Sequence, residues 1–170
     1  MWPFTRRRER AQIHALIRKY LSDEVADELL NNPSRVRLET QRTDICFILM
    51  QIRDDPVDQV QAHLETAFDI IIRRDGTICD QMSSFVLSIF GHPIEIDPER
   101  ASDQRAKSVA RLVTELGSNI RLVHGTAAGL VGNIGSQQRF HYGVLLPNFA
   151  RYMSALTALE FGQSAEIRPT

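Results

Sequence analysis

The sequence predicts a single α+β domain, an antiparallel sheet covered by helices, preceded by an N-terminal helix. Its 170 residues are enough for one ordinary domain and too few for two. Short apolar, β-rich runs alternate with longer stretches in which apolar residues recur every three or four positions. Glycine and proline stand between many of these segments, where chains turn.

The first segment predicts an amphipathic helix, because its apolar residues recur at helical spacing. They are Ile13, Leu16, Ile17, Tyr20 and Leu21. Ser22 then caps a second, short helix that ends before Pro33. We assign residues 1–21 to a signalling or dimerisation helix and residues 22–170 to the globular domain. The first helix either folds back on its own domain or pairs with a second copy as a coiled coil.

The run TDICFILMQI, residues 43–52, is apolar on both faces and predicts a central strand. The other expected elements are a helix from Asp55 to about Arg74, strands at 77–80 and 84–90, a helix from Pro98 to Gly117, strands at 120–126, 129–134 and 140–146, and a helix from Pro147 to about Phe161. Strands 120–126 and 129–134 are expected to pair with each other. The order βαββαβ, with an extra strand and helix, resembles the ferredoxin-like architecture, in which helices cover one face of the sheet. The end of the chain, SAEIRPT, predicts no further strand and leaves a sheet edge exposed.

Composition excludes several classes of function. The net charge of −1 argues against a nucleic-acid partner, which requires a concentrated basic surface. No run of about 18 apolar residues predicts a transmembrane segment, and MWPFTRRRER lacks the apolar centre of a secretory signal, so we expect a cytoplasmic protein. Cys46 and Cys79 lie in apolar runs without metal-binding spacing and are expected to be buried, reduced thiols. We expect no metal and no cofactor.

Four segments together resemble the catalytic domain of class III nucleotidyl cyclases, the adenylate and guanylate cyclases. They are YLSDEVADELLNNP, FILMQIR, DGTICDQMSSFVLSIFGHP and GTAAGLVGNIGSQQRFHYGVL. The most specific piece, VGNIGSQQRFHY, is close to the family run V-G-N-x-G-S-x-x-R-x-x-Y. The resemblance extends from about Tyr20 to Phe161 and implies the ferredoxin-like core of that family.

In the family, two carboxylates hold divalent ions. The resemblance aligns the positions of these carboxylates with Gln51 and Ser84 in this chain. A neutral amide and a hydroxyl are weak ligands for a hard dication when no carboxylate is present. We therefore predict that the metal pair is lost.

The resemblance implies that four further functional positions are substituted. The purine-reading lysine falls at Asp80, its aspartate partner at Pro147, and the asparagine and arginine of the transition state at Ala150 and Ser154. Loss of an arginine that stabilises phosphate charge costs orders of magnitude in rate. The sequence therefore predicts a pseudoenzyme, with Arg53 and Arg151 as candidate vestigial ligand contacts.

In the family, the glycine-rich hairpin contributes to the dimer and to the wall of the site. The corresponding residues are Gly129, Gly132, Asn133, Gly135, Arg139 and Tyr142. Gly129 and Gly132 also have a purely structural explanation, because glycine permits close backbone approach in strands.

We interpret the chain as a catalytically inactive cyclase homology domain that acts as a dimerising signal-transduction module. A head-to-tail homodimer is the expected assembly. Two alternatives stay open: a metal-independent nucleotide sensor, and a non-catalytic partner subunit of an active cyclase.

Overall fold

The computed structural model describes residues 27, 31, 39–54, 56–93, 96–136 and 139–168, with the backbone alone at 135, 136 and 139–141. The predicted helix within residues 1–21 and the short helix after Ser22 lie outside this range, except for isolated positions of the latter. The division between residues 1–21 and 22–170 therefore stays a prediction. Across the described ranges, we find no helix that is both long and apolar enough to cross a membrane.

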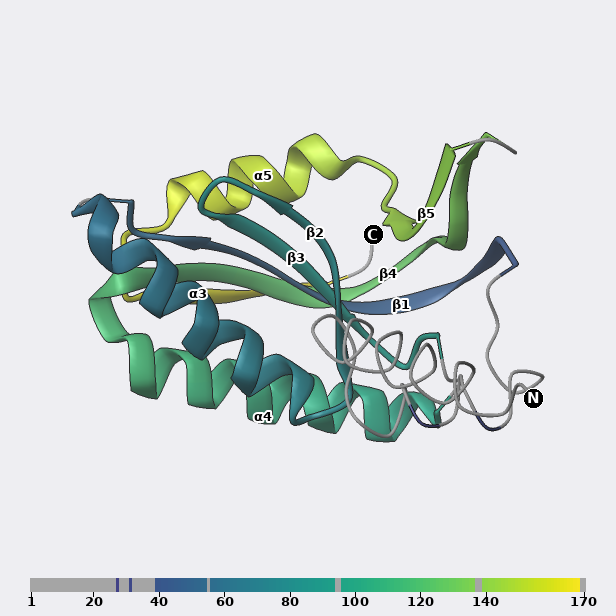
Figure 1. The fold of residues 1–170 in the computed structure, drawn as a ribbon, viewed down its shortest axis with the longest axis horizontal. Coiled ribbons are helices and arrows are strands. Elements are labelled where there is room, and N and C mark those ends of the chain that lie inside the picture. The colour runs from purple at the N-terminus through teal and green to yellow at the C-terminus, as the bar shows by residue number, and fades with distance from the viewer. Residues whose placement is uncertain are drawn as a thin grey trace, which may run out of the picture.

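The described chain forms one six-stranded sheet and three α-helices (Figure 1). The elements are β1 (Gln41–Ile52), α3 (Val57–Ile72), β2 (Gly76–Met82), β3 (Phe85–Phe90), α4 (Pro98–Leu116), the 3₁₀ turn η2 (Gly117–Asn119), β4 (Ile120–Ser136), β5 (Arg139–Leu145), α5 (Phe149–Ala158) and β6 (Ser164–Ile167). The strand order is β2-β3-β1-β4-β5, and these strands pair antiparallel. The predicted α+β class, the βαββαβ core and the central position of β1 are confirmed.

The two faces of the sheet are covered by different helices. α3 and α4, the helices of the core, share one face as predicted, and α5 lies on the other (Figure 1). Successive side chains of β1 point to opposite faces of the sheet. Ile48 and Met50 pack beneath α3 and α4, whereas Phe47 and Leu49 pack beneath α5. The rings of Phe47 and Tyr152 lie 5.0 Å apart between their centroids. Each face therefore has its own hydrophobic core.

The predicted hairpin between strands 120–126 and 129–134 is wrong. These residues belong to one continuous strand, β4, which pairs with β1 from Ile52↔Ile120 to Gln41↔Val131. Ala127 and Ala128 are small residues that extended backbone accepts, and neither has a positive φ. Gly129 serves close packing instead of a turn, because a Cβ there would lie 2.7 Å from the carbonyl oxygen of Leu145.

Two expectations for the end of the chain are also corrected. α5 begins at Phe149, because Asn148 adopts a left-handed conformation (φ 56°), and it ends at Ala158, because Leu159 is extended. The segment SAEI forms the strand β6, which pairs parallel with β4 from Leu122↔Ser164 to Gly125↔Ile167. That part of the β4 edge is therefore covered.

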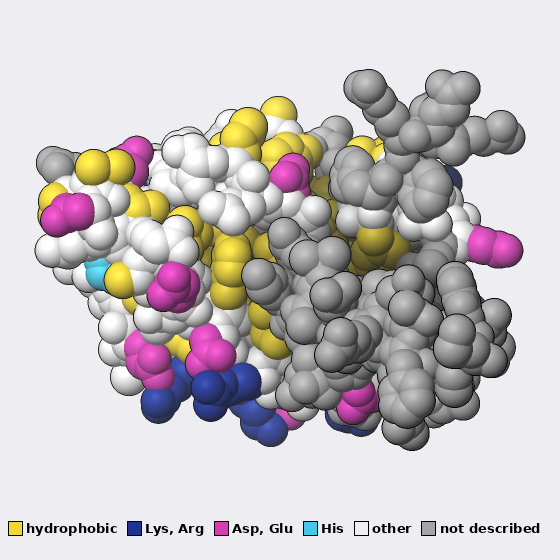
Figure 2. Space-filling model, in the orientation of Figure 1, with side chains coloured by type: hydrophobic (Ala, Val, Ile, Leu, Met, Phe, Trp, Pro, Cys, Tyr) yellow, Lys and Arg dark blue, Asp and Glu magenta, His cyan; other side chains and the backbone are white. Residues whose placement is uncertain are grey.

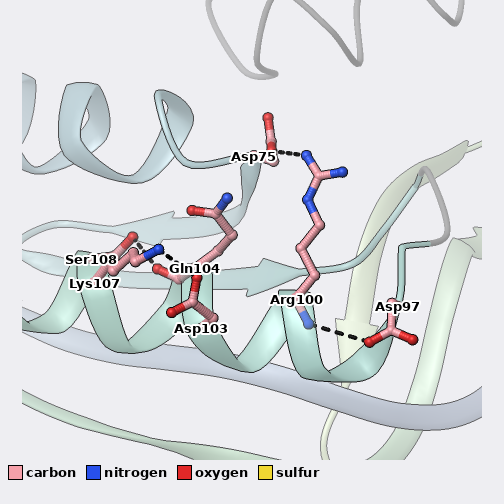
Figure 3. A network of polar contacts seen from close by, with 7 residues as sticks. All are labelled: Asp75, Asp97, Arg100, Asp103, Gln104, Lys107 and Ser108. Carbon is pink, nitrogen blue, oxygen red and sulfur yellow. Dashed lines mark hydrogen bonds and ion pairs between the residues drawn. The ribbon is translucent and has the colours of Figure 1, made fainter.

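Polar contacts fix the start of α4 (Figure 3). The Asp97 side chain caps the helix by accepting from the backbone N–H groups of Glu99 at 2.8 Å and Arg100 at 3.4 Å. Arg100 Nη2 also donates to Asp75 Oδ2 at 3.1 Å, at the turn between α3 and β2. Farther along α4, Lys107 pairs with Asp103, and charged side chains gather on the outer side of this helix (Figure 2).

Candidate functional site

The side chain of Gln51 ends the row of β1 residues that faces α5. It is only 9% exposed, and Ile45, Phe47 and Leu49 precede it in the same buried row. Its Oε1 accepts two hydrogen bonds from Arg121, at 2.9 Å from Nε and 2.6 Å from Nη2. Arg121 is the register partner of Gln51 on β4, so the sheet itself sets this contact. Gln51, which the resemblance predicts to replace a metal-binding carboxylate, is thus an amide that binds a guanidinium.

Arg121 joins the sheet to the end of α5. Its Nη1 donates to the carbonyl oxygens of Thr157 at 3.0 Å and Leu159 at 2.8 Å. Carbonyls at a helix C-terminus carry partial negative charge and attract a cation. The guanidinium also lies over the Phe161 ring, 4.9 Å from its centroid. Arg121 is therefore held by neutral acceptors and an aromatic face.

Arg53 contacts the same ring from the position just after β1. Its Cζ lies 4.3 Å from the Phe161 centroid, and Nε and Nη2 donate to the carbonyl oxygen of Ser118 at 3.1 and 3.0 Å. Within the part of the chain that the structure describes, neither Arg53 nor Arg121 has a carboxylate partner. Two cations thus share one aromatic ring at this end of the sheet.

Ser84 lies beside Ile52, at the end of β1. It is 2% exposed, and its carbonyl oxygen accepts from the Ile52 N–H at 2.8 Å, next to the tight turn at Ser83 (φ 56°). Divalent cations such as Mg²⁺ require carboxylate oxygens. Here the donors are a hydroxyl and an amide oxygen already bound to a guanidinium, so this pair does not fit two divalent ions. Among the described residues, no three His, Cys, Asp or Glu side chains gather as metal ligands.

The other predicted positions lie elsewhere. Asp80 is exposed on β2, while Ala150 and Ser154 are exposed along α5. Pro147 is exposed just before α5 and lines a cavity of about 400 Å³ together with Arg42, Asp44, Tyr152 and neighbouring residues. Arg151 is exposed on α5. The backbone of Ser84 pairs with Ile52, the residue after Gln51, and the arginine that binds Gln51 is Arg121.

The predicted hairpin residues form contacts inside the chain. A Cβ at Gly132, which has φ +135°, would lie 2.5 Å from the carbonyl oxygen of Glu39. The carbonyl of Asn133 accepts from Thr40 Oγ1 at 2.6 Å. Burial, and then the nearby Cys79 thiol, raise the pKa of Tyr142. Gly135 and Arg139 belong to the paired ends of β4 and β5, where Gly135 opposes Phe140 and Ser136 opposes Arg139. The role of these six residues in a dimer stays a prediction.

Sequence reasoning missed Arg121 and Phe161. Arg121 interrupts the apolar alternation of β4, and this interruption is the sequence feature that could have identified it as a site residue. Its meaning depends on the register between β1 and β4, which places it opposite Gln51. Phe161 was read as the end of a helix, whereas it follows α5 and packs under two arginines.

No protein-family model matches the chain, and no curated protein matches it significantly. Solved structures with the same architecture are adenylyl and guanylyl cyclases. The adenylyl cyclase CyaB from P. aeruginosa is 21% identical with a TM-score of 0.61, over 75% of this chain and 78% of that chain. A bacterial light-regulated adenylyl cyclase is 15% identical with a TM-score of 0.63, over 91% of this chain and 52% of that chain.

The guanylate cyclase domain of RhGC from Catenaria anguillulae, in complex with GTP, is 10% identical with a TM-score of 0.59. That match covers 73% of this chain and 78% of that chain. At these identities the comparisons show the fold. The chain therefore has the fold of adenylyl and guanylyl cyclase catalytic domains, as the resemblance predicted.

Proposed function

We propose that the chain is a catalytically inactive class III cyclase homology domain that acts as a dimerising signal-transduction module. The fold supports the cyclase-homology part of this proposal. The substituted positions, above all Gln51 and its contact with Arg121, support the loss of catalysis. Within this proposal, residues 22–170 are the module and residues 1–21 are a helix that transmits the signal or contributes to the dimer.

The bond between Gln51 and Arg121 carries the proposal. Two-metal chemistry needs carboxylates that attract both cations and orient them. At this position a neutral oxygen accepts from a permanent cation at 2.6 and 2.9 Å, so an approaching dication meets a positive charge. Neither Gln51 nor Ser84, the two positions that the resemblance assigns to metal ligands, has a carboxylate to offset the charge of Arg121.

Exposed apolar side chains support the assembly part of the proposal. Met82 is 70% exposed at the end of β2, and Leu145 and Phe149 are exposed at the end of β5 and the start of α5. Figure 2 shows hydrophobic side chains over the β2–β3 hairpin and α5 on the viewed face. Such side chains mark surfaces that bind other proteins. We propose a second copy of this chain as the partner, and a related cyclase chain as the alternative partner.

The test is incubation of the purified protein with ATP or GTP and excess Mg²⁺ or Mn²⁺, with products separated by chromatography. We expect no cyclic nucleotide. Product that a Gln51→Leu variant no longer makes would overturn the proposed inactivity. Sedimentation equilibrium tests the assembly, with a dimer expected and a monomer at all concentrations contradicting it.

A second candidate function is nucleotide binding without metal. The observation that favours it is the pair of guanidinium groups on Phe161, which lacks a carboxylate partner among the described residues. Calorimetric titration with ATP and GTP in a chelator tests it, using Arg53→Gln and Arg151→Gln variants. The matched control is Arg73→Gln, an exposed arginine just after α3 that pairs with Asp69. Binding that Arg53→Gln weakens, but Arg73→Gln does not, would support this candidate, and an absence of binding would remove it. Arg151→Gln tests the other predicted ligand contact, which lies outside the pair on Phe161.

A further inference from the structure

Three charged or titratable side chains meet where α4, β4 and β6 pack together. Arg105 of α4 is only 6% exposed, and its Nη2 donates to Glu166 Oε1 of β6 at 3.0 Å and to Ser102 Oγ at 3.3 Å. His124 of β4 is the register partner of Glu166 in the parallel pair, and both residues interact electrostatically with Arg105. Three segments far apart in the sequence are thus connected by one buried cation.

β6 depends on this cluster more than a longer strand would. Its four residues pair with one neighbour only, β4. Short strands at sheet edges open at low free-energy cost, because few contacts hold them. Gly125 lets the strand sit closely, since a Cβ there would lie 2.3 Å from the carbonyl oxygen of Ile167. Among the described residues, the ion pair between Arg105 and Glu166 is a side-chain bond that ties β6 to a helix.

The cluster is short of hydrogen-bond partners. Nε of Arg105 and Nδ1 of His124 are both buried without an acceptor or donor among the described residues. Glu166 is the carboxylate that pairs with Arg105, and its side chain is 54% exposed. The buried charge of Arg105 is therefore stable only while Glu166 pairs with it and the His124 imidazole is neutral.

We propose that Arg105, His124 and Glu166 form a proton-sensitive latch that holds β6 on β4. At neutral pH the imidazole of His124 is neutral and the Arg105–Glu166 pair closes the latch. Protonation of His124 places a second cation beside Arg105, the latch opens, and β6 leaves the edge of β4.

The direction of the pH effect follows from the surroundings of His124. Burial, and then the positive charge of Arg105, lower its pKa below the usual 6.5, while Glu166 acts in the opposite direction. On the β1 side its register partner is Ile48, which carries no charge. The opened state therefore binds a proton more readily than the closed state. The latch is closed above about pH 6.5 and weakens as the pH falls below that value.

Native-state hydrogen exchange on the full chain tests the latch. The opening constant of the β6 amides is measured between about pH 7.5 and pH 5.5, with the intrinsic exchange rate divided out. One linked proton changes this constant by at most about tenfold per pH unit. We expect a rise of about threefold to tenfold on acidification in the natural chain, and no pH dependence in His124→Gln. The matched control is His63→Gln, another half-buried histidine on α3, in which the rise should persist.

A second variant keeps the test independent of how well His124→Gln folds. Glu166→Gln removes the counter-charge on the exposed strand, so β6 should exchange faster than in the natural chain even at about pH 7.5. Amides of the central strand β1 should stay protected in both variants. The proposal is overturned if His124→Gln keeps the pH dependence of the natural chain, or if Glu166→Gln leaves β6 exchange unchanged at neutral pH.

Discussion

Two of the buried or half-buried arginines that the structure describes, Arg121 and Arg105, are stabilised in different ways. Arg121, on the α5 face, donates to the oxygens of Gln51, Thr157 and Leu159 and lies over Phe161. Arg105, on the α4 face, has one ionised partner, Glu166, and keeps an Nε that no described residue accepts from. One cation is satisfied by neutral dipoles and the other by a single opposite charge.

The difference predicts how each site responds to change. Neutral acceptors keep their oxygens at any pH, so the Arg121 contacts should be permanent. The imidazole of His124 near Arg105 does titrate, so the Arg105 contacts depend on pH. Arg121 binds Gln51, which the resemblance assigns to a substituted metal-ligand position, and Arg105 lies beside the short strand β6.

The largest effect is expected from Arg121→Met. Removal of the guanidinium leaves the partly buried oxygens of Gln51, Thr157 and Leu159 without their donor, which should lower the free energy of unfolding by about 2 to 4 kcal/mol. Urea denaturation measures it. The control is Arg111→Met, an exposed arginine that pairs with Glu115 within α4 and should change stability little. Equal losses in the two variants would contradict the importance of Arg121.

Glu166→Gln should have the next largest effect. The amide still accepts from Arg105, but the buried cation loses its counter-charge, and we expect a loss of about 1 to 2 kcal/mol. Because the Glu166 side chain is about half exposed, water screens part of the charge and limits the loss. Urea denaturation at neutral pH measures it, and a free energy of unfolding equal to that of the natural chain would contradict this account.

Gln51→Glu gives Arg121 a carboxylate partner, as Glu166 is for Arg105. A carboxylate beside the guanidinium should have a lowered pKa in the folded chain, and the gain in stability should be about 0.5 to 1 kcal/mol at neutral pH. Because the folded pKa is the lower one, the gain is present above the unfolded value of ~4.3 and is lost as the pH falls through the folded pKa. Thermal unfolding from about pH 7 to pH 3 measures it, and destabilisation at neutral pH would show that burial outweighs the attraction.

Arg53→Gln should have the smallest effect. Arg53 is exposed, so loss of its contacts with Ser118 and Phe161 should change the free energy of unfolding by less than about 0.5 kcal/mol. Urea denaturation measures it beside Arg121→Met. A loss of stability as large as that of Arg121→Met would mean that the packing of the Phe161 ring requires both arginines, which would contradict the smaller role given to Arg53.

The sequence predicted most elements because their apolar periods are clear. The strand at 43–52 and the helices near 57–72 and 98–116 follow from local patterns. The continuity of β4 and the formation of β6 do not, because both depend on pairing with distant residues. The family resemblance assigned Gln51 and Ser84 to metal-ligand positions, and this assignment stays a prediction. The contact of Gln51 with Arg121 was not predicted, since it depends on the register between β1 and β4 and on the end of α5.

The long pairing between β1 and β4 has a consequence for how the chain folds during synthesis. Eight consecutive buried residues of β1, from Ile45 to Ile52, are made about 70 to 80 residues before their partners on β4. At roughly 5–20 residues per second, a ribosome needs several seconds to supply those partners. Contacts of such high sequence separation form slowly, and an apolar strand that waits for them is prone to aggregate. We expect the nascent chain to depend on chaperones until β4 emerges, with pulse proteolysis of stalled chains ending before and after residue 136 as the measurement.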